Sequence, residues 1–242
     1  MTKVPPNGAV KMVRLGEGER IWVGVDTHRK SYHVAVWSDT RGSVIASWAQ
    51  PADPSKLMRR VLPHREHLVK IVYEAGPTGF GLARDLQAAG LTVEVVAPSC
   101  TPVPAGPQAK SDRLDCRRLA QFAASGLLRA IYIPTQQQEA DRQVVRVREQ
   151  VLSKTRRVKQ QIKSFLLQHG IDQPAGLGNW SSAAVDELRE LGMNPQLRFC
   201  LDLLLEDLDH ARALVKKATR EVKSLAETKR HVAAVELLTS AP

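Results

Sequence analysis

The sequence predicts a mixed α/β domain over residues 21–134, followed by a helical region over residues 135–242. Two observations predict the α/β domain: three short strand patterns joined by tight turns come first, and helix and strand patterns then alternate. A third observation sets the boundary, because apolar residues adopt a helical spacing after Pro134. Residues 1–20 show no such period and contain several prolines and glycines, so we expect a flexible leader there.

The α/β part divides into short elements bounded by glycine, proline and polar residues. Apolar or alternating runs predict strands over residues 21–25, 31–38, 43–50, 68–73 and 92–97. Helical patterns cover residues 54–62, 80–89 and 112–125, and Thr78 is a candidate N-cap for the second of them. Three hairpin strands followed by alternating helices and strands is the order expected of a ribonuclease H-like α/β domain.

The helical region contains two apolar stripes at coiled-coil spacing, separated by a glycine- and proline-rich stretch over residues 170–179. The first stripe is Val144, Val147, Val151, Thr155, Val158, Ile162 and Phe165. The second is Leu197, Leu201, Leu204, Leu208, Ala211, Val215, Ala218, Val222 and Leu225. Two long helices around a short connection form either an antiparallel pair within one chain or strands of an inter-chain coiled coil.

The charge balance indicates a polyanionic partner. The chain carries 35 Lys and Arg against 25 Asp and Glu, a net charge of +10, which favours nucleic acid first and an anionic membrane second. Basic residues are densest on the first long helix and beside an acidic pair near residue 112. The candidate nucleic-acid contacts are Lys110, Arg113, Arg117, Arg146, Lys154 and Arg157. Aromatic residues make up only 5%, so we expect recognition of the backbone or of A-form shape.

The spacing of the cysteines and the hydropathy of the chain indicate its cellular compartment. Three cysteines with no C-x-x-C spacing indicate neither a disulfide framework nor a zinc site. Apolar runs do not approach the ~18 residues of a membrane span, and the N-terminus lacks a signal-peptide core. We therefore expect a cytoplasmic protein.

Four acids fall where a ribonuclease H-like fold would gather them. Asp26 follows the first strand pattern, Glu74 follows the fourth, and Asp112 and Asp115 open the late helix three residues apart. Each acid alone could be a turn or helix-cap residue, but the set suggests a shared site. Two Mg²⁺ ions roughly 3.5–4 Å apart can stabilise attack on a phosphodiester, and Mg²⁺ prefers carboxylate oxygens. We therefore predict a magnesium site, with two ions, for phosphodiester chemistry.

Three motifs resemble the DEDD transposases of the IS110 insertion-sequence family. They are Val-Gly-Val-Asp-Thr-His-Arg-Lys over residues 23–30, Tyr-Glu-Ala-Gly-Pro-Thr-Gly over 73–79 and Lys-Ser-Asp-Arg-Leu-Asp over 110–115. This resemblance implies a RuvC-like domain with Asp26, Glu74, Asp112 and Asp115 as the Mg²⁺-binding set. It also implies a recombinase guided by a structured bridge RNA, which assembles as an oligomer on donor and target DNA. The family's covalent nucleophile is a serine in a separate C-terminal domain.

The sequence departs from that pattern at its end. It stops at Ser240-Ala-Pro242, where the serine-bearing domain of the family would begin, so we expect that domain to be absent. Ser240 is not the counterpart of that serine, and this chain is assigned no nucleophile. We expect DNA strand cleavage and exchange from the complete protein and none from this chain alone. The alternatives are a non-catalytic remnant that binds nucleic acid or co-assembles with intact subunits, and a metal-dependent junction resolvase or nuclease that uses water.

Overall fold

The computed structural model describes residues 14–100 and 112–240, and the side chains of residues 14–99 and 116–240. The chain separates into two compact units, residues 1–134 and 135–242. Unit 1 is built on a sheet and unit 2 is built from helices. Lys110 and the rest of residues 101–111 lie outside the described residues.

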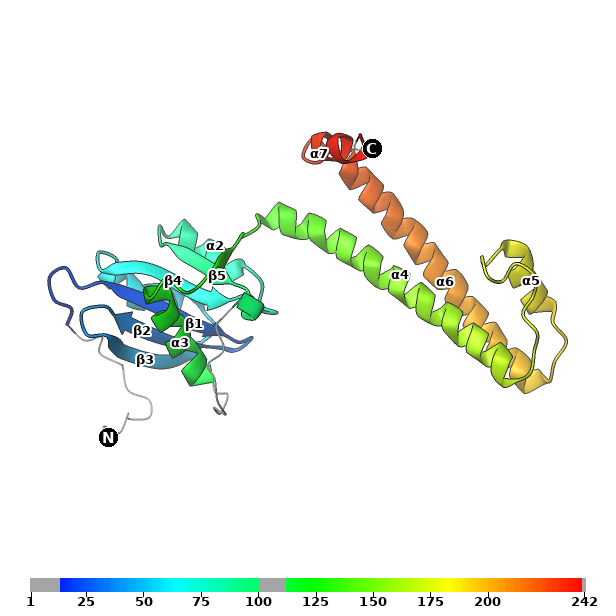
Figure 1. Cartoon of the computed structure of the whole chain (residues 1–242), viewed down its shortest axis with the longest axis horizontal. Helices are drawn as coiled ribbons and strands as arrows, with labels where there is room; N and C mark the ends of the chain where they lie inside the picture. The colour runs from blue at the N-terminus through cyan, green and yellow to red at the C-terminus, as the bar shows by residue number, and fades with distance from the viewer. Residues whose placement is uncertain (1–13, 101–111, 241–242) are drawn as a thin grey trace. The chain divides into compact units, whose positions relative to one another are not determined.

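Unit 1 contains a six-stranded mixed sheet (Figure 1). Its strands are β1 (Ile21–Thr27), β2 (Ser31–Ser38), β3 (Ser43–Pro51), β4 (Leu68–Glu74), β5 (Val93–Val96) and β6 (Ala130–Ile131). The spatial order is β3-β2-β1-β4-β5-β6. The first three strands pair antiparallel, whereas β4 pairs parallel with β1 and β5 pairs parallel with β4. This topology confirms the predicted ribonuclease H-like domain.

The short strand β6 is the last regular element of unit 1. It pairs antiparallel with β5, with Ile131 opposite Val95. Pro134 follows at the last position of the unit, and its carbonyl oxygen accepts a hydrogen bond from the Arg84 guanidinium at 3.2 Å.

Helices cover both faces of the sheet. On one face α1 (Pro54–Val61) and α2 (Gly81–Ala88) bury Leu57 and Leu86 against Val23, Ile71 and other strand residues. On the other face α3 (Asp112–Ala124) packs Leu119 and Ala123 on Trp22, Val72 and Val96. Successive strand residues point to opposite faces, so the alternation of these apolar residues specifies both layers.

Two details of unit 1 differ from the sequence prediction. Helix α2 begins at Gly81, with Phe80 at the N-cap position and no side-chain cap. The Thr78 hydroxyl instead lies 3.3 Å from the Thr27 hydroxyl, so its assignment as the N-cap is wrong. The helix predicted over residues 54–62 ends as an α-helix at Val61, and a 3-10 turn over Leu62–His64 follows it.

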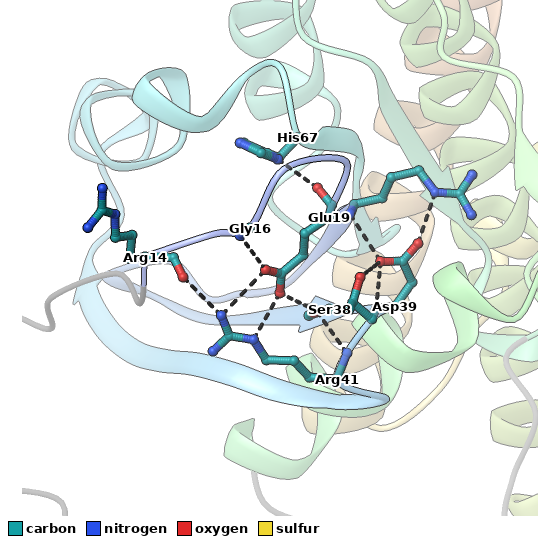
Figure 2. A network of polar contacts seen from close by, with 9 residues as sticks. Arg14, Gly16, Glu19, Ser38, Asp39, Arg41 and His67 are labelled. Carbon is teal, nitrogen blue, oxygen red and sulfur yellow. Dashed lines mark hydrogen bonds and ion pairs between the residues drawn. The ribbon is translucent and has the colours of Figure 1, made fainter.

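A polar network holds residues 14–20, which the sequence assigned to the flexible leader (Figure 2). Glu19 is buried, and its carboxylate accepts hydrogen bonds from the Ser38 hydroxyl at 2.5 Å and the Gly16 amide at 2.8 Å. The Arg41 guanidinium lies 3.0 Å from the same carboxylate. The His67 ring donates from Nδ1 to the Glu19 backbone oxygen at 2.7 Å. These bonds connect the segment before β1 to β2 and to the start of β4.

Unit 2 is an antiparallel pair of long helices with two short ones. They are α4 (Gln136–Gln168), α5 (Ser182–Glu190), α6 (Pro195–Ala226) and α7 (Val232–Thr239). The Thr135 hydroxyl and the Gln138 side chain form a capping box at the start of α4, and Asn194 caps α6. Within one chain, Arg148 contacts Thr219 and Lys154 contacts Asp207, so the two helices run in opposite directions.

The apolar core of unit 2 lies at the connected ends of α4 and α6. Val158, Ile162 and Leu166 pack there with Leu201, Leu205 and other residues, including those of α5. The predicted first stripe is therefore buried in its second half, whereas Val147 is 39% exposed. In the described part of the chain, no helix is both long and apolar enough to cross a membrane.

The opposite ends of α4 and α6 are joined by a buried carboxylate. Asp141 of α4 accepts hydrogen bonds from Gln137 at 2.9 Å, from His231 at 3.0 Å and from Arg230 at 3.2 Å. The bond from His231, followed by that from Gln137, lowers the pKa of Asp141 below its usual value. The charged form of Asp141 is thus the form that fits this site.

Gly24 is the first position that can be tested. A methyl group at Gly24 would lie 2.1 Å from the Cys116 carbonyl oxygen and 2.6 Å from the Ala120 nitrogen, both of them backbone atoms of α3. We expect Gly24→Ala to reduce the free energy of unfolding by about 3 kcal/mol, because overpacking against backbone cannot be relieved by a rotamer change. Urea denaturation measures this. Gly81→Ala is the control: its methyl group would meet no other atom at the start of α2, so this variant should be neutral. Equal effects of the two variants on the free energy of unfolding would contradict the close packing at Gly24.

Glu19 provides a pH-dependent test. The Ser38 and Gly16 hydrogen bonds hold the pKa of Glu19 below its usual 4.5. A lowered folded-state pKa adds stability that is complete above pH 4.5 and is lost as the pH falls through the folded value. Glu19→Gln should therefore lower Tm at pH 7, and the difference from the unmodified chain should shrink below pH 4.5. Exposed Glu17→Gln is the control, and a difference that persists unchanged into acid would contradict the assignment.

Candidate metal centre

Asp26 and Glu74 stand at the carboxyl ends of two adjacent parallel strands. The parallel register of β1 and β4 pairs Gly24 with Val72 and Val25 with Tyr73. The next residue on each strand is Asp26 on β1 and Glu74 on β4. Parallel strands in register bring their carboxyl ends to one edge of a sheet, so the two acids are neighbours there.

The alternation of the strands places both acids on the face that α3 covers. Trp22 and Val72 belong to the core beneath α3, and Asp26 and Glu74 follow them at even spacing on β1 and β4. Gly24 lies between Trp22 and Asp26, and its missing side chain lets the α3 backbone approach β1.

Cys116 of α3 marks how close the helix comes to Asp26. The thiol is buried, and this burial raises its pKa to about 11, with a further contribution from the negative charge of Asp26. The described part of α3 thus begins beside Asp26. The residues that precede Cys116 in the same helix are 112–115.

The other two predicted acids are not described at the level of side chains. The backbone of Asp112 and Asp115 lies in the first turn of α3, and Arg113 lies between them, but these side chains are outside the described residues. Within residues 14–99 and 116–240, no group of three or more His, Cys, Asp or Glu side chains could hold a metal ion. The structure therefore brings Asp26 and Glu74 together and leaves the full set of four as a prediction.

Two histidines that sequence reasoning left aside lie against Asp26. The His28 Nε2 atom is 3.1 Å from Asp26 Oδ2, and the Asp26 side chain is 20% exposed. The β1–β2 register places His33 opposite Asp26, and the His28 and His33 rings meet edge to face with centroids 6.0 Å apart. The feature of the sequence that could have identified His28 is the tight turn after β1, which brings His28 back toward the strand end.

The donor chemistry of this edge fits a hard divalent cation. Asp26 and Glu74 are partly exposed, so solvent and ions can reach their oxygens. Carboxylate oxygens are the ligands that Mg²⁺ prefers, and Mg²⁺ retains water when few protein ligands are supplied. These two carboxylates are therefore of the ligand type that Mg²⁺ prefers, and further ligands would have to complete its coordination.

The predicted nucleic-acid contacts are spread over both units. Arg117 of α3 is half-buried, and its Nε atom has no hydrogen-bond partner among the residues that the structure describes. Arg146, Lys154 and Arg157 are exposed on α4. Lys154 forms an ion pair with Asp207 at 2.9 Å.

The strand order and the carboxyl-edge acids define the class of protein as ribonuclease H-like. Two solved structures are similar to part of this chain. The large terminase nuclease from thermophilic phage G20c is 16% identical with a TM-score of 0.33, and covers 40% of this chain and 55% of its own. RuvC of Thermus thermophilus is 12% identical with a TM-score of 0.32, and covers 46% of this chain and 99% of its own. At such TM-scores the class rests on the strand order and directions of this sheet.

The family follows from sequence comparison. The family model DEDD_Tnp_IS110, a transposase family, matches residues 23–171, and this chain belongs to that family. "Putative transposase y4qE" of Sinorhizobium fredii (strain NBRC 101917 / NGR234) is 33% identical over 173 residues, which are 70% of this chain and 44% of y4qE. The transposase for insertion sequence element IS1533 of Leptospira borgpetersenii is 23% identical over 181 residues, which are 74% of this chain and 52% of that protein. The chain spans about half the length of these curated relatives.

The electrostatic effect of Asp26 on Cys116 can be tested by thiol labelling. In a variant whose only cysteine is Cys116, we expect slow reaction with a maleimide at pH 8, because the buried thiol is protonated there. Adding Asp26→Asn should speed the reaction, since the loss of a nearby negative charge lowers the thiol pKa. Asp85→Asn on α2, which covers the other face of the sheet, is the control. Equal rates for the two variants would show that Asp26 does not lie near the thiol.

Proposed function

We propose that this chain is the metal-binding part of a DNA transposase. In this proposal Asp26, Glu74, Asp112 and Asp115 hold Mg²⁺, as two ions, for cleavage and exchange of DNA strands. The single observation that carries it is the position of Asp26 and Glu74, which end neighbouring parallel strands on the face where α3 starts. Membership of the transposase family supports the reaction class.

In this proposal the residues of the chain position the metal-binding carboxylates and supply their negative charge. Bound magnesium would neutralise the negative charge that builds on the phosphate oxygens during attack. The His28 ring, 3.1 Å from the Asp26 carboxylate, restricts the orientation of that side chain. The packing of α3 at Gly24 fixes the distance between the helix and the strand ends. The chain itself supplies no nucleophile in this proposal.

DNA is the proposed substrate, and a structured guide RNA is the proposed second partner. The net charge of +10 supports a polyanionic partner, since phosphate backbones bind clustered Lys and Arg. Lys110, Arg113 and Arg117 are proposed to contact nucleic acid near the acids, and Arg146, Lys154 and Arg157 along α4. RNA guidance and assembly as a homo-oligomer through the long helices rest on the family resemblance.

The metal proposal is tested by titrating Mn²⁺ into the chain and following free Mn²⁺ by electron paramagnetic resonance. Asp26→Asn and Glu74→Gln should each weaken binding by about tenfold or more, because changing even a residue that only hydrogen-bonds to a metal ligand costs about 10–100-fold in metal affinity. Asp85→Asn on α2 removes the same charge on the opposite face and should bind as the unmodified chain does.

The outcomes separate the candidate functions. If Asp26→Asn and Asp85→Asn bind Mn²⁺ equally well, the metal assignment is wrong and a non-catalytic role in binding or co-assembly replaces it. If the chain alone nicks branched DNA in Mg²⁺, and Asp26→Asn abolishes the nicking, a nuclease that uses water as nucleophile replaces the transposase proposal.

A further inference from the structure

Three basic side chains of unit 2 gather around one tryptophan. Lys159 of α4 places its Nζ atom 5.3 Å from the centroid of the Trp180 ring. Arg212 of α6 donates a hydrogen bond to the Trp180 backbone oxygen at 2.7 Å. Lys163 lies one helical turn after Lys159, on the same side of α4. We call Lys159, Lys163 and Arg212 the Trp180 cluster.

The positive charges of the Trp180 cluster are not balanced by acids. None of its three residues forms an ion pair with an acid in the described part of unit 2, residues 135–240. Burial, and then the charges of Arg212 and Lys163, lower the pKa of Lys159 below its usual value. Lys159 therefore lies close enough to both Arg212 and Lys163 for their positive charges to act on it.

Some other cations of the same unit form ion pairs with acids. Lys154 pairs with Asp207, Arg189 pairs with Asp209, and Arg198 pairs with Asp202. An ordinary solvated helix face predicts mixed signs and such pairs. Unlike the other unpaired cations of α4 and α6, Lys159 and Arg212 of the Trp180 cluster are both held against one residue, Trp180.

The backbone at Trp180 is strained, which shows that this geometry is maintained at a cost. Trp180 has a φ of 58°, in the left-handed region that disfavours bulky residues. Its ring is only 8% exposed and packs in the core of unit 2 with Ile162 and Leu205. The buried ring forms the floor beneath Lys159, and the strained backbone turns the Trp180 oxygen toward Arg212.

We propose that the Trp180 cluster binds the phosphodiester backbone of a nucleic acid. Phosphate oxygens would supply the counter-charge that unit 2 lacks at this place, with charge-assisted hydrogen bonds from the ammonium and guanidinium groups. Because the Trp180 ring is buried, it is not a stacking platform for bases. The cluster therefore recognises backbone rather than sequence. This inference rests on the nucleic-acid partner of the proposed function and is independent of the metal site.

The test compares the salt dependence of binding by fluorescence anisotropy. The probes are a labelled 30-base-pair DNA duplex, an RNA hairpin and a single strand of each, which identify the kind of backbone bound. Lys159→Gln/Lys163→Gln/Arg212→Gln should bind at least tenfold more weakly at low salt. Each lost phosphate contact removes about 0.9 from the slope of log K against log salt for duplex DNA, or about 0.7 for single strands, so a drop of about 2–3 is expected.

A matched control separates the Trp180 cluster from the effect of net charge. Arg220→Gln/Lys223→Gln/Lys229→Gln removes three exposed positive charges from the far end of α6 and the turn after it. This control should lose little affinity and keep most of its slope. Equal losses in the two triple variants would overturn the proposal, as would tight binding of poly-glutamate that depends on the cluster in the same way.

Folding is checked with a single substitution. Arg212→Gln removes a hydrogen bond and could unfold the segment. Lys159→Gln removes no hydrogen bond, and its loss of the cation–π contact with Trp180 is offset by relief of repulsion. Lys159→Gln should therefore keep Tm close to that of the unmodified chain and still reduce the slope by about one. An unchanged slope in this folded variant would overturn the site, whereas the Mn²⁺ titration of Asp26→Asn would still decide the metal proposal on its own.

Discussion

The contact between the α3 backbone and β1 at Gly24 is the constraint on which unit 1 depends. No side chain separates helix and strand there, so the helix lies on the sheet at the closest distance that backbone atoms allow. Gly24 is also two residues before Asp26 on the same face of the strand. Gly24, which lets the helix approach, and Asp26, the candidate metal ligand, are thus neighbours on β1. The packing of α3 and the candidate site therefore depend on the same close approach of helix and strand. Cys116, Leu119 and Ala123 then bury the rest of the interface.

Unit 2 holds its long helices by different forces at their two ends. Apolar side chains around Ile162 and Leu205 pack at the connected end, and the gain there comes from removing apolar surface from water. At the other end, the buried Asp141 carboxylate satisfies its oxygens with Gln137, Arg230 and His231. Between them, valines of α4 line an apolar groove facing α6. The pair is therefore held at both ends, and the Arg148–Thr219 and Lys154–Asp207 contacts join the two helices between those ends.

Local patterns in the sequence were sufficient for most of unit 1. Strands with period-two burial, such as Ser31–Ser38, and strand ends carrying Asp26 and Glu74 were predictable because each signal lies within a few residues. The close packing of α3 against Gly24 was not predictable, since it depends on a helix that lies about 90 residues further along the chain. The His33 neighbour of Asp26 needed the register of the β1–β2 hairpin, which sequence alone does not fix to one residue.

The helical region was harder to predict for a related reason. Helix α5 was missed although Ser181 caps it and Ala184, Val185 and Leu188 form its buried stripe, because the glycine-rich stretch before it suggested a continuous loop. The second stripe also shifts in the structure: Leu205 is buried, whereas Leu204 is only partly so. A heptad pattern predicts which side of a helix is apolar, but the helix that lies opposite decides which members are covered.

Trp180 shows that the local and the global preferences of a chain need not agree. Its backbone conformation is one that glycine or asparagine would adopt with less strain, yet only a large ring fills the space between α4 and α6. Glycine at position 180 would relieve the backbone strain but leave a cavity in the core of unit 2. A tryptophan with a right-handed backbone conformation would change the direction of the chain before α5. No single substitution satisfies both demands. The packing of unit 2 therefore holds the backbone of Trp180 in a conformation that its local preference opposes.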